Sequence, residues 1–140
     1  MDPIRDLLHA YADAVCHDDA DRWIATWVDD AVWDLGAGHE SAGRDAILEL
    51  WLSAMARYRS VLHRYENSAA TVDPDRGTGH GRAYVTEVLH PVDGPPLVMH
   101  GYYDDEYRLD VGRWRFARRE LVRLYEGPPD SSGFTSTPPD

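Results

Sequence analysis

Residues 97–125, LVMHGYYDDEYRLDVGRWRFARRELVRLY, decide the fold. They form two β-rich segments with alternating polar and apolar residues on either side of Asp110-Val111-Gly112, which is typical of a hairpin turn. Upstream, Asp73-Pro74-Asp75-Arg76-Gly77 is a second strong turn signal between two similar segments. The four predicted strands are residues 61–72, 81–90, 97–109 and 113–125. Because short turns join antiparallel neighbours, these strands predict one antiparallel sheet.

Three amphipathic helix patterns precede this sheet. Asp2 is a suitable N-cap for the first, with Pro3 at its first helical position. The apolar stripes are Ile4, Leu7, Leu8, Tyr11 and Val15; then Trp23, Ile24, Trp27 and Val28; then Ile47, Leu48, Trp51, Leu52, Met55 and Tyr58. A short strand is predicted at residues 31–35. Helices followed by such a sheet predict an α+β layer fold with the helices on one face. We expect a single domain over residues 1–126 and a disordered tail over residues 127–140.

Composition limits the partners and the chemistry. The 140 residues carry a net charge of −11, so nucleic acid and anionic membrane surfaces are not expected as partners. There is no lysine, which excludes Schiff-base catalysis and pyridoxal phosphate chemistry. A single cysteine, Cys16, and a charged N-terminus without a signal-peptide pattern predict a cytoplasmic protein. An apolar outer sheet face would be covered most simply by a homodimer.

The sequence does not predict a metal ion or another cofactor. The seven histidines are scattered, without an i, i+4 pair or an H-x-H pair that would suit a metal. A Gly-x-Ser-x-Gly nucleophile motif is also missing from the sequence.

Several short motifs stand in order along the chain: Tyr11-Ala12-Asp13-Ala14, Asp21-Arg22-Trp23, Trp27-Val28-Asp29-Asp30-Ala31-Val32-Trp33, Gly43-Arg44-Asp45-Ala46-Ile47, His63-x-x-x-Asn67 and Gly112-Arg113-Trp114-Arg115-Phe116-Ala117-Arg118-Arg119. Together they resemble the SnoaL-like proteins of the nuclear transport factor 2-like superfamily over about residues 4–125. The resemblance implies a cone-shaped α+β barrel with a curled, mixed but mostly antiparallel sheet. It does not imply one function, since this superfamily contains dehydratases, isomerases, epoxide hydrolases, polyketide cyclases, dioxygenase small subunits and binding modules.

The resemblance suggests three catalytic residues. His63 matches a pocket histidine of scytalone dehydratase-like members, where a neutral imidazole can take a proton and return it to a leaving hydroxyl. Tyr11 and Asp105 match two groups that donate to a substrate carbonyl in ketosteroid isomerase-type members. The alternatives are structural: His63 bonded to a backbone carbonyl, Tyr11 packed in the core, and Asp105 facing solvent.

Two departures from these relatives leave further candidates. The isomerase base falls at about Leu35, with Asp34 one residue away on the opposite strand face. The dehydratase aspartate of the first helix falls at about Cys16, with Asp13 nearby on another helix face. We therefore keep Asp34 and Asp13 as candidate catalytic residues.

The expected pocket wall is largely aromatic and suits a polycyclic, aromatic or polyketide-like substrate. It consists of Trp27, Trp33, Leu35, Met55, Tyr65, Asn67 and Tyr103. The leading hypothesis is a cofactor-independent dehydratase or isomerase that acts on a small molecule. The alternatives are a polyketide cyclase, a hydratase or an epoxide hydrolase on the same scaffold, a non-catalytic ligand-binding protein, and an oxygenase small subunit.

Overall fold

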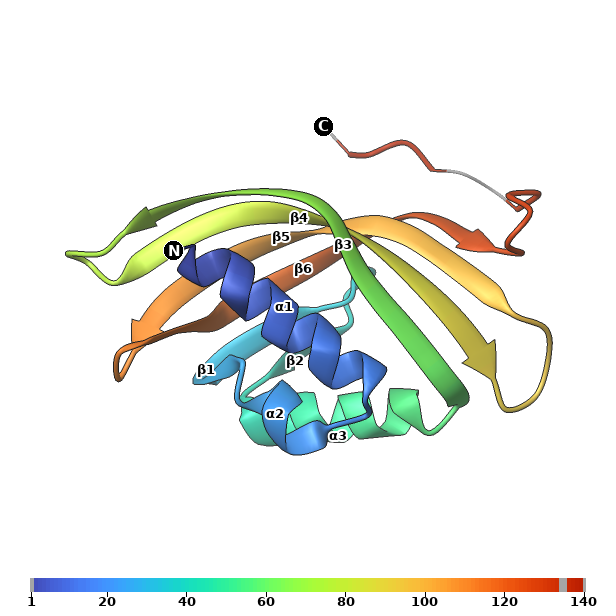
Figure 1. The fold of residues 1–140 in the computed structure, drawn as a ribbon, viewed down its shortest axis with the longest axis horizontal. Helices are drawn as coiled ribbons and strands as arrows, with labels where there is room; N and C mark the ends of the chain where they lie inside the picture. The colour runs from blue at the N-terminus through green and yellow to red at the C-terminus, as the bar shows by residue number, and fades with distance from the viewer. Residues whose placement is uncertain (1, 134–135, 140) are drawn as a thin grey trace.

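The computed structural model describes residues 2–133 and 136–139 and has three helices and six strands (Figure 1). Their order is α1 (Pro3–Cys16), α2 (Ala20–Ile24), β1 (Trp27–Asp34), β2 (Glu40–Ala42), α3 (Arg44–Met55), β3 (Tyr58–Asp73), β4 (Thr78–Pro91), β5 (Leu97–Asp110) and β6 (Arg113–Gly127). No described helix is both long enough and apolar enough to cross a membrane.

The six strands form one mixed sheet in the order β2-β1-β6-β5-β4-β3. All neighbours are antiparallel except β1 and β6, which are parallel. The sheet curls over the helices, which all lie on its concave side, and its edges do not meet (Figure 1). The predicted α+β fold, with three helices on a curled and mostly antiparallel sheet, is confirmed, although the sheet stays open instead of closing into a barrel.

Helix α1 forms as its sequence predicts. The Asp2 carboxylate accepts hydrogen bonds from the backbone N–H groups of Ile4 and Arg5, each at 3.1 Å, and Pro3 follows at the first helical position. The predicted apolar stripe is buried in full, and the helix packs chiefly against β3. Tyr11, only 1% exposed, is thereby held at the centre of the concave side.

The second helix was predicted too long. It ends at Ile24, and Trp27 and Val28 belong to strand β1 instead of to a helical stripe. Both side chains are buried, and Trp27 pairs with Phe116 of β6. The parallel partner strand therefore determines the conformation of this segment, because it satisfies the backbone groups of an aromatic and β-branched run. The short strand β2 was not predicted.

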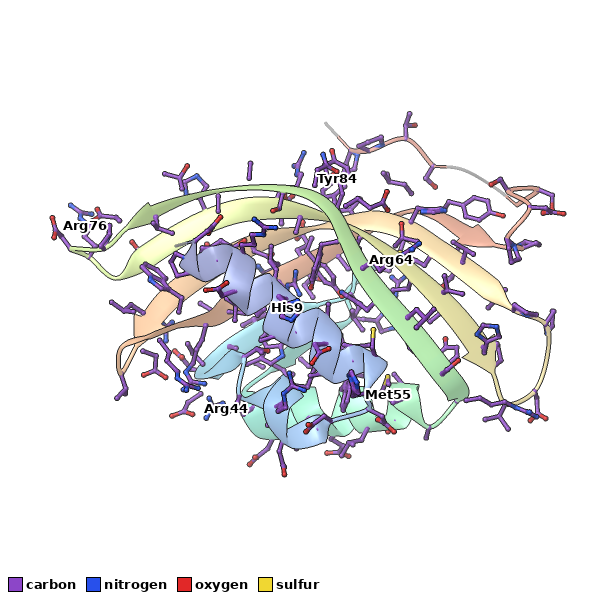
Figure 2. The ribbon with its side chains drawn as sticks, viewed as in Figure 1. His9, Arg44, Met55, Arg64, Arg76 and Tyr84 are labelled. Carbon is purple, nitrogen blue, oxygen red and sulfur yellow. The ribbon has the colours of Figure 1, made fainter. Side chains whose placement is uncertain are left out.

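In the part of the chain that the structure describes, all helices lie on the concave side, so none covers the outer face of the sheet. In Figure 2, Tyr84 lies on this face, whereas Met55 lies at the end of α3 on the concave side. Across three strands of the outer face, the Thr86 hydroxyl contacts the Glu66 carboxylate and lies 2.9 Å from Nδ1 of His100.

The segment after Gly127 has neither helix nor strand in its described residues, 128–133 and 136–139. The Tyr125 hydroxyl donates to the carbonyl of Pro128 at 2.6 Å and accepts from the N–H of Gly133 at 3.1 Å. Residues 134, 135 and 140 of the predicted tail, and Met1 of the predicted domain, lie outside the described residues.

Candidate active site

A cavity of about 130 Å³ lies between the concave side of the sheet and helices α1 and α3. Most of its wall is apolar: Val15, Trp33, Leu35, Trp51, Ala54, Met55, Val61, Leu89, Met99 and Leu121. Tyr11, His63, Glu87 and Tyr103 add polar groups to this wall, and Arg57, Arg123 and Glu126 add exposed charges. An apolar hollow with a few converging polar groups is the usual form of a small-molecule site.

The central polar contact of the cavity joins His63 to Glu87. These residues are direct cross-strand partners on β3 and β4, and Nδ1 of His63 lies 2.9 Å from a Glu87 carboxylate oxygen. The His63 side chain is 1% exposed and that of Glu87 is 22% exposed. Because a carboxylate only accepts, Nδ1 is the donor to Glu87, and in a neutral imidazole Nε2 then has the free lone pair. Within the described residues, Nε2 is buried and has no hydrogen-bond partner.

Cys16 lies beside His63 and contacts its backbone, not its imidazole ring. The backbone N–H of His63 donates to the Cys16 sulfur at 3.3 Å. The helix position that resembles the dehydratase aspartate thus lies beside the histidine backbone and holds a thiol. The carboxylate partner of the histidine comes instead from Glu87 of β4, which the sequence analysis did not identify.

Tyr11 and Tyr103 supply phenol groups to the cavity. The ring centroid of Tyr11 lies 5.3 Å from that of His63 and 6.5 Å from that of Tyr103. Burial raises the pKa of both phenols above the ordinary value, so they remain protonated hydrogen-bond donors at neutral pH. Tyr11 is therefore both a core residue and a donor at the cavity wall.

The buried phenols predict a loss of stability in alkali. Burial also raises the pKa of Tyr65 well above the ordinary value of 10.0. Above about pH 10 the unfolded chain loses phenolic protons that the folded chain keeps, so the free energy of unfolding falls as the pH rises. Titration of phenolate absorbance is expected to show a group of tyrosines that ionise only as the protein unfolds. Ionisation of all eight tyrosines near pH 10 in a folded protein would contradict this.

Asp105 does not line the cavity. Its carboxylate accepts two hydrogen bonds from Arg119, at 2.7 and 3.1 Å, and both side chains are 0% exposed. Arg119 also donates to the Tyr65 hydroxyl at 2.7 Å, and its guanidinium lies 3.8 Å from the ring centroid of Tyr103. Burial raises the pKa of the Asp105 carboxyl and Arg119 opposes this shift. The structure thus places Asp105 as the counter-ion of Arg119 in the core, in place of the expected second donor to a substrate.

The two other candidate carboxylates lie away from the cavity. Asp34 accepts from Arg118 at 3.0 Å and from the N–H of Gly36 at 2.8 Å. Asp13 is partly exposed and accepts from Arg22 at 2.7 Å, and this hydrogen bond lowers the pKa of its carboxyl. Both carboxylates are engaged by arginine, so the geometry does not favour either as a base.

The expected pocket wall divides into two groups. Trp33, Leu35, Met55 and Tyr103 line the cavity. Trp27 does not line the cavity and is buried in the aromatic core, and Tyr65 and Asn67 line an open groove between α1 and β3. His63 borders both the cavity and this groove.

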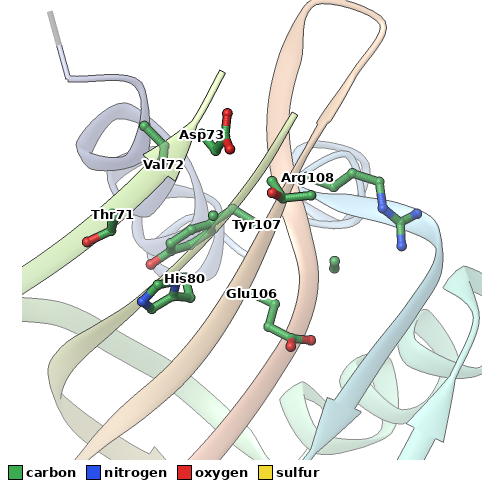
Figure 3. A pocket seen from close by; sticks show the side chains of 10 residues that line it. Thr71, Val72, Asp73, His80, Glu106, Tyr107 and Arg108 are labelled. Atoms are coloured by element: carbon green, nitrogen blue, oxygen red, sulfur yellow. The ribbon is translucent and has the colours of Figure 1, made fainter. Parts of the chain in front are cut away.

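A larger hollow, about 450 Å³, lies where β3 and β4 meet at the other end of the sheet (Figure 3). It is open, and its charged side chains are exposed, with Arg108 paired to Asp30 at 2.6 Å. No cluster of three or more potential metal ligands occurs among the described residues. The smaller cavity therefore remains the candidate active site.

Comparison with known proteins gives a family and a fold. The chain matches the SnoaL-like domain family over residues 1–120, while no curated protein sequence matches it significantly. A candidate scytalone dehydratase from Novosphingobium aromaticivorans has a TM-score of 0.84 and 20% identity over 97% of this chain and 90% of that chain. A candidate aromatic ring hydroxylase from the same organism has a TM-score of 0.81 and 30% identity over 92% of this chain and 93% of that chain. The LinA-type3 hexachlorocyclohexane dehydrochlorinase of Novosphingobium barchaimii has a TM-score of 0.80 and 23% identity over 98% of this chain and 93% of that chain.

Proposed function

The chain belongs to the SnoaL-like domain family, and from this premise we propose that it is a cofactor-independent acid–base enzyme of the dehydratase or isomerase type. The observation that carries the proposal is the buried His63, which lines an apolar cavity, bonds through Nδ1 to Glu87 and has no partner for Nε2 among the described residues. A histidine held in one tautomer by a carboxylate, with its other nitrogen free, is the arrangement of a general base.

The reaction would begin with proton transfer from a substrate carbon to Nε2 of His63. In a dehydration, the C–H electron pair becomes a C=C bond and the hydroxyl leaves with the C–O pair. The proton held by His63 then leaves with the hydroxyl as water. In an isomerisation, His63 returns the proton to another carbon. Tyr11 would donate a hydrogen bond to a substrate oxygen, either a carbonyl or the departing hydroxyl.

The names of two structural neighbours support an elimination. A scytalone dehydratase removes water, and a hexachlorocyclohexane dehydrochlorinase removes hydrogen chloride. In both reactions a base takes a proton while a neighbouring group leaves. One basic nitrogen in an apolar cavity suits this step, and neither a metal nor a redox cofactor is needed for it.

A second candidate function follows from the neighbour with 30% identity, a candidate aromatic ring hydroxylase. On that reading the chain would be a small subunit or ligand-binding partner of a larger oxygenase. It predicts co-purification with an iron–sulfur protein from the native host. Isolation of the chain without such a partner would favour the acid–base enzyme.

The proposal can be tested before the natural substrate is known. We expect the protein in D2O to exchange the α-protons of cyclic ketones, and to dehydrate cyclic β-hydroxy ketones, faster than buffer alone, as followed by proton NMR. These cyclic ketones and β-hydroxy ketones form the ligand panel, and their binding is detected by chemical-shift changes of the protein. If panel ligands bind but show neither exchange nor elimination, the proposal is contradicted.

A further inference from the structure

The aromatic core contains three indole N–H groups that are buried and have no acceptor among the described residues. They belong to Trp23, Trp27 and Trp33. Of these three residues, Trp33 lines the cavity. A buried donor without a partner is unfavourable, and such groups in native proteins are rare enough to require an explanation. For Trp33, a ligand in the cavity can provide the missing acceptor.

Two residues of the cavity wall, Trp33 and His63, therefore each have a buried polar atom without a partner among the described residues. Nε2 of His63 can accept, and Nε1 of Trp33 can only donate. We propose that the Trp33 N–H holds the carbonyl oxygen of the substrate while His63 takes a proton from the neighbouring carbon. This inference rests on the proposed function and specifies how the substrate is oriented.

The chemistry of the two kinds of donor decides which oxygen Trp33 holds. An indole N–H does not give up its proton, so it suits an oxygen that stays in place and gains negative charge. A departing hydroxyl needs a group that can transfer a proton. Tyr11 and His63, whose rings lie 5.3 Å apart, have ionisable protons and suit that end of the substrate.

The size of the cavity defines the substrate further. An apolar cavity of about 150 Å³ is sufficient to bind benzene. The cavity here, at about 130 Å³, is similar in size, so its volume suits a single six-membered ring. The substrate class is therefore a monocyclic ketone, or a larger molecule that inserts one ring. The aromatic content of the sequence predicted a polycyclic, aromatic or polyketide-like substrate, and the cavity volume restricts this range to molecules that insert one ring.

Trp51 provides a matched control for Trp33. It also lines the cavity, and it stacks on Trp23 with ring centroids 4.6 Å apart and planes 10° apart. Its indole nitrogen is not among the buried atoms that lack a partner. Replacing either tryptophan with phenylalanine shortens one aromatic side chain in the wall, but only Trp33→Phe removes an indole N–H that is both buried and without a partner among the described residues.

Two ligands of the same shape separate hydrogen bonding from apolar burial. Cyclohexanone has a carbonyl oxygen, and methylenecyclohexane has a CH2 group in its place. In ¹⁵N-labelled protein, cyclohexanone is expected to shift the indole N–H signal of Trp33 downfield, and methylenecyclohexane is not. An unmoved Trp33 signal with cyclohexanone bound would overturn the proposal, and this measurement does not require any variant to fold.

Affinities provide the second test. The ratio of the two dissociation constants, alkene over ketone, is expected to fall on the order of tenfold in Trp33→Phe and to stay unchanged in Trp51→Phe. An equal fall in both variants, an unchanged ratio in Trp33→Phe, or binding of neither ligand at millimolar concentration would overturn the proposal. Because binding is measured without turnover, failure here is distinct from failure of the proton-exchange test.

Discussion

A His63→Gln variant is expected to lose turnover by about 10²- to 10⁴-fold, the usual contribution of a general base. Glutamine fills similar space and keeps a polar group beside Glu87, but its amide cannot take a proton from carbon. The measurement is the rate of α-proton exchange or dehydration with the best ligand of the panel. His100→Gln is the matched control, since His100 is also bonded through Nδ1, to Thr86 at 2.9 Å, but lies on the outer face. Equal losses in both variants would contradict the assignment of His63 as the base.

Glu87 acts through His63, so its replacement tests the same assignment in a graded way. In Glu87→Gln the new amide can donate to Nδ1 as well as accept from it, so the imidazole is no longer restricted to one tautomer. We expect a loss of turnover smaller than that of His63→Gln. The ¹⁵N NMR signals of the His63 ring should show the proton on Nδ1 in the original protein and a mixture of tautomers in the variant. A lower rate with unchanged ring signals would indicate a merely structural role for Glu87.

The long elements of this fold could be predicted from sequence because each has a strong local pattern. The stripe of α1, with its Asp2 cap and Pro3, and the hairpin between β5 and β6 were both predicted at nearly their observed bounds. The apolar residues around Trp27 have a spacing that fits a helix, and their aromatic and β-branched side chains fit a strand equally well. Only the neighbouring strand β6, remote in sequence, decides between them.

The pairs His63–Glu87 and Asp105–Arg119 could not be predicted, because both lie beyond a β-bulge. Counting back from the turn between β3 and β4 would pair His63 with Val88, and a register shift between Tyr65 and Ser68 makes Glu87 its partner. A shift by one residue exchanges the two faces of a strand, and the sequence does not mark where it occurs. His63 was therefore identified from family resemblance, whereas its carboxylate partner was not.

A register shift also explains why the pairing of Arg119 with Asp105 was not predicted. Counting from the turn between β5 and β6 would place Asp105 opposite Arg118, but a shift between Glu106 and Tyr107 places it opposite Arg119. Asp105 thereby meets a guanidinium in the core and becomes a counter-ion. The resemblance that suggested a donor role for Asp105 carried no information about this neighbour.

Replacing Arg119 by methionine is expected to lower the free energy of unfolding by about 3–5 kcal/mol, because it leaves the buried Asp105 carboxylate without its partner. This is a large part of the total stability of a typical domain, about 5–15 kcal/mol. Urea unfolding at neutral pH measures the loss. Arg82→Met is the control, since Arg82 makes a similar two-bond contact with Asp104, at 2.7 and 3.2 Å, on the exposed face. Its loss should be below about 1 kcal/mol.

Two further measurements distinguish two causes of this loss of stability: the unpaired Asp105 carboxylate and the lost packing contacts of the Arg119 side chain. With Arg119 gone, the pKa of Asp105 is raised chiefly by burial, so the folded variant binds a proton that the unfolded chain binds less readily. The folded state of Arg119→Met should therefore recover stability as the pH is lowered from 7 towards 4. The double variant Arg119→Met, Asp105→Leu removes both charges and should regain most of the loss at neutral pH, because an apolar pair can replace a buried ion pair. If the double variant is no more stable than Arg119→Met, the contacts of the guanidinium with the surrounding rings, and not its charge, hold this part of the core together.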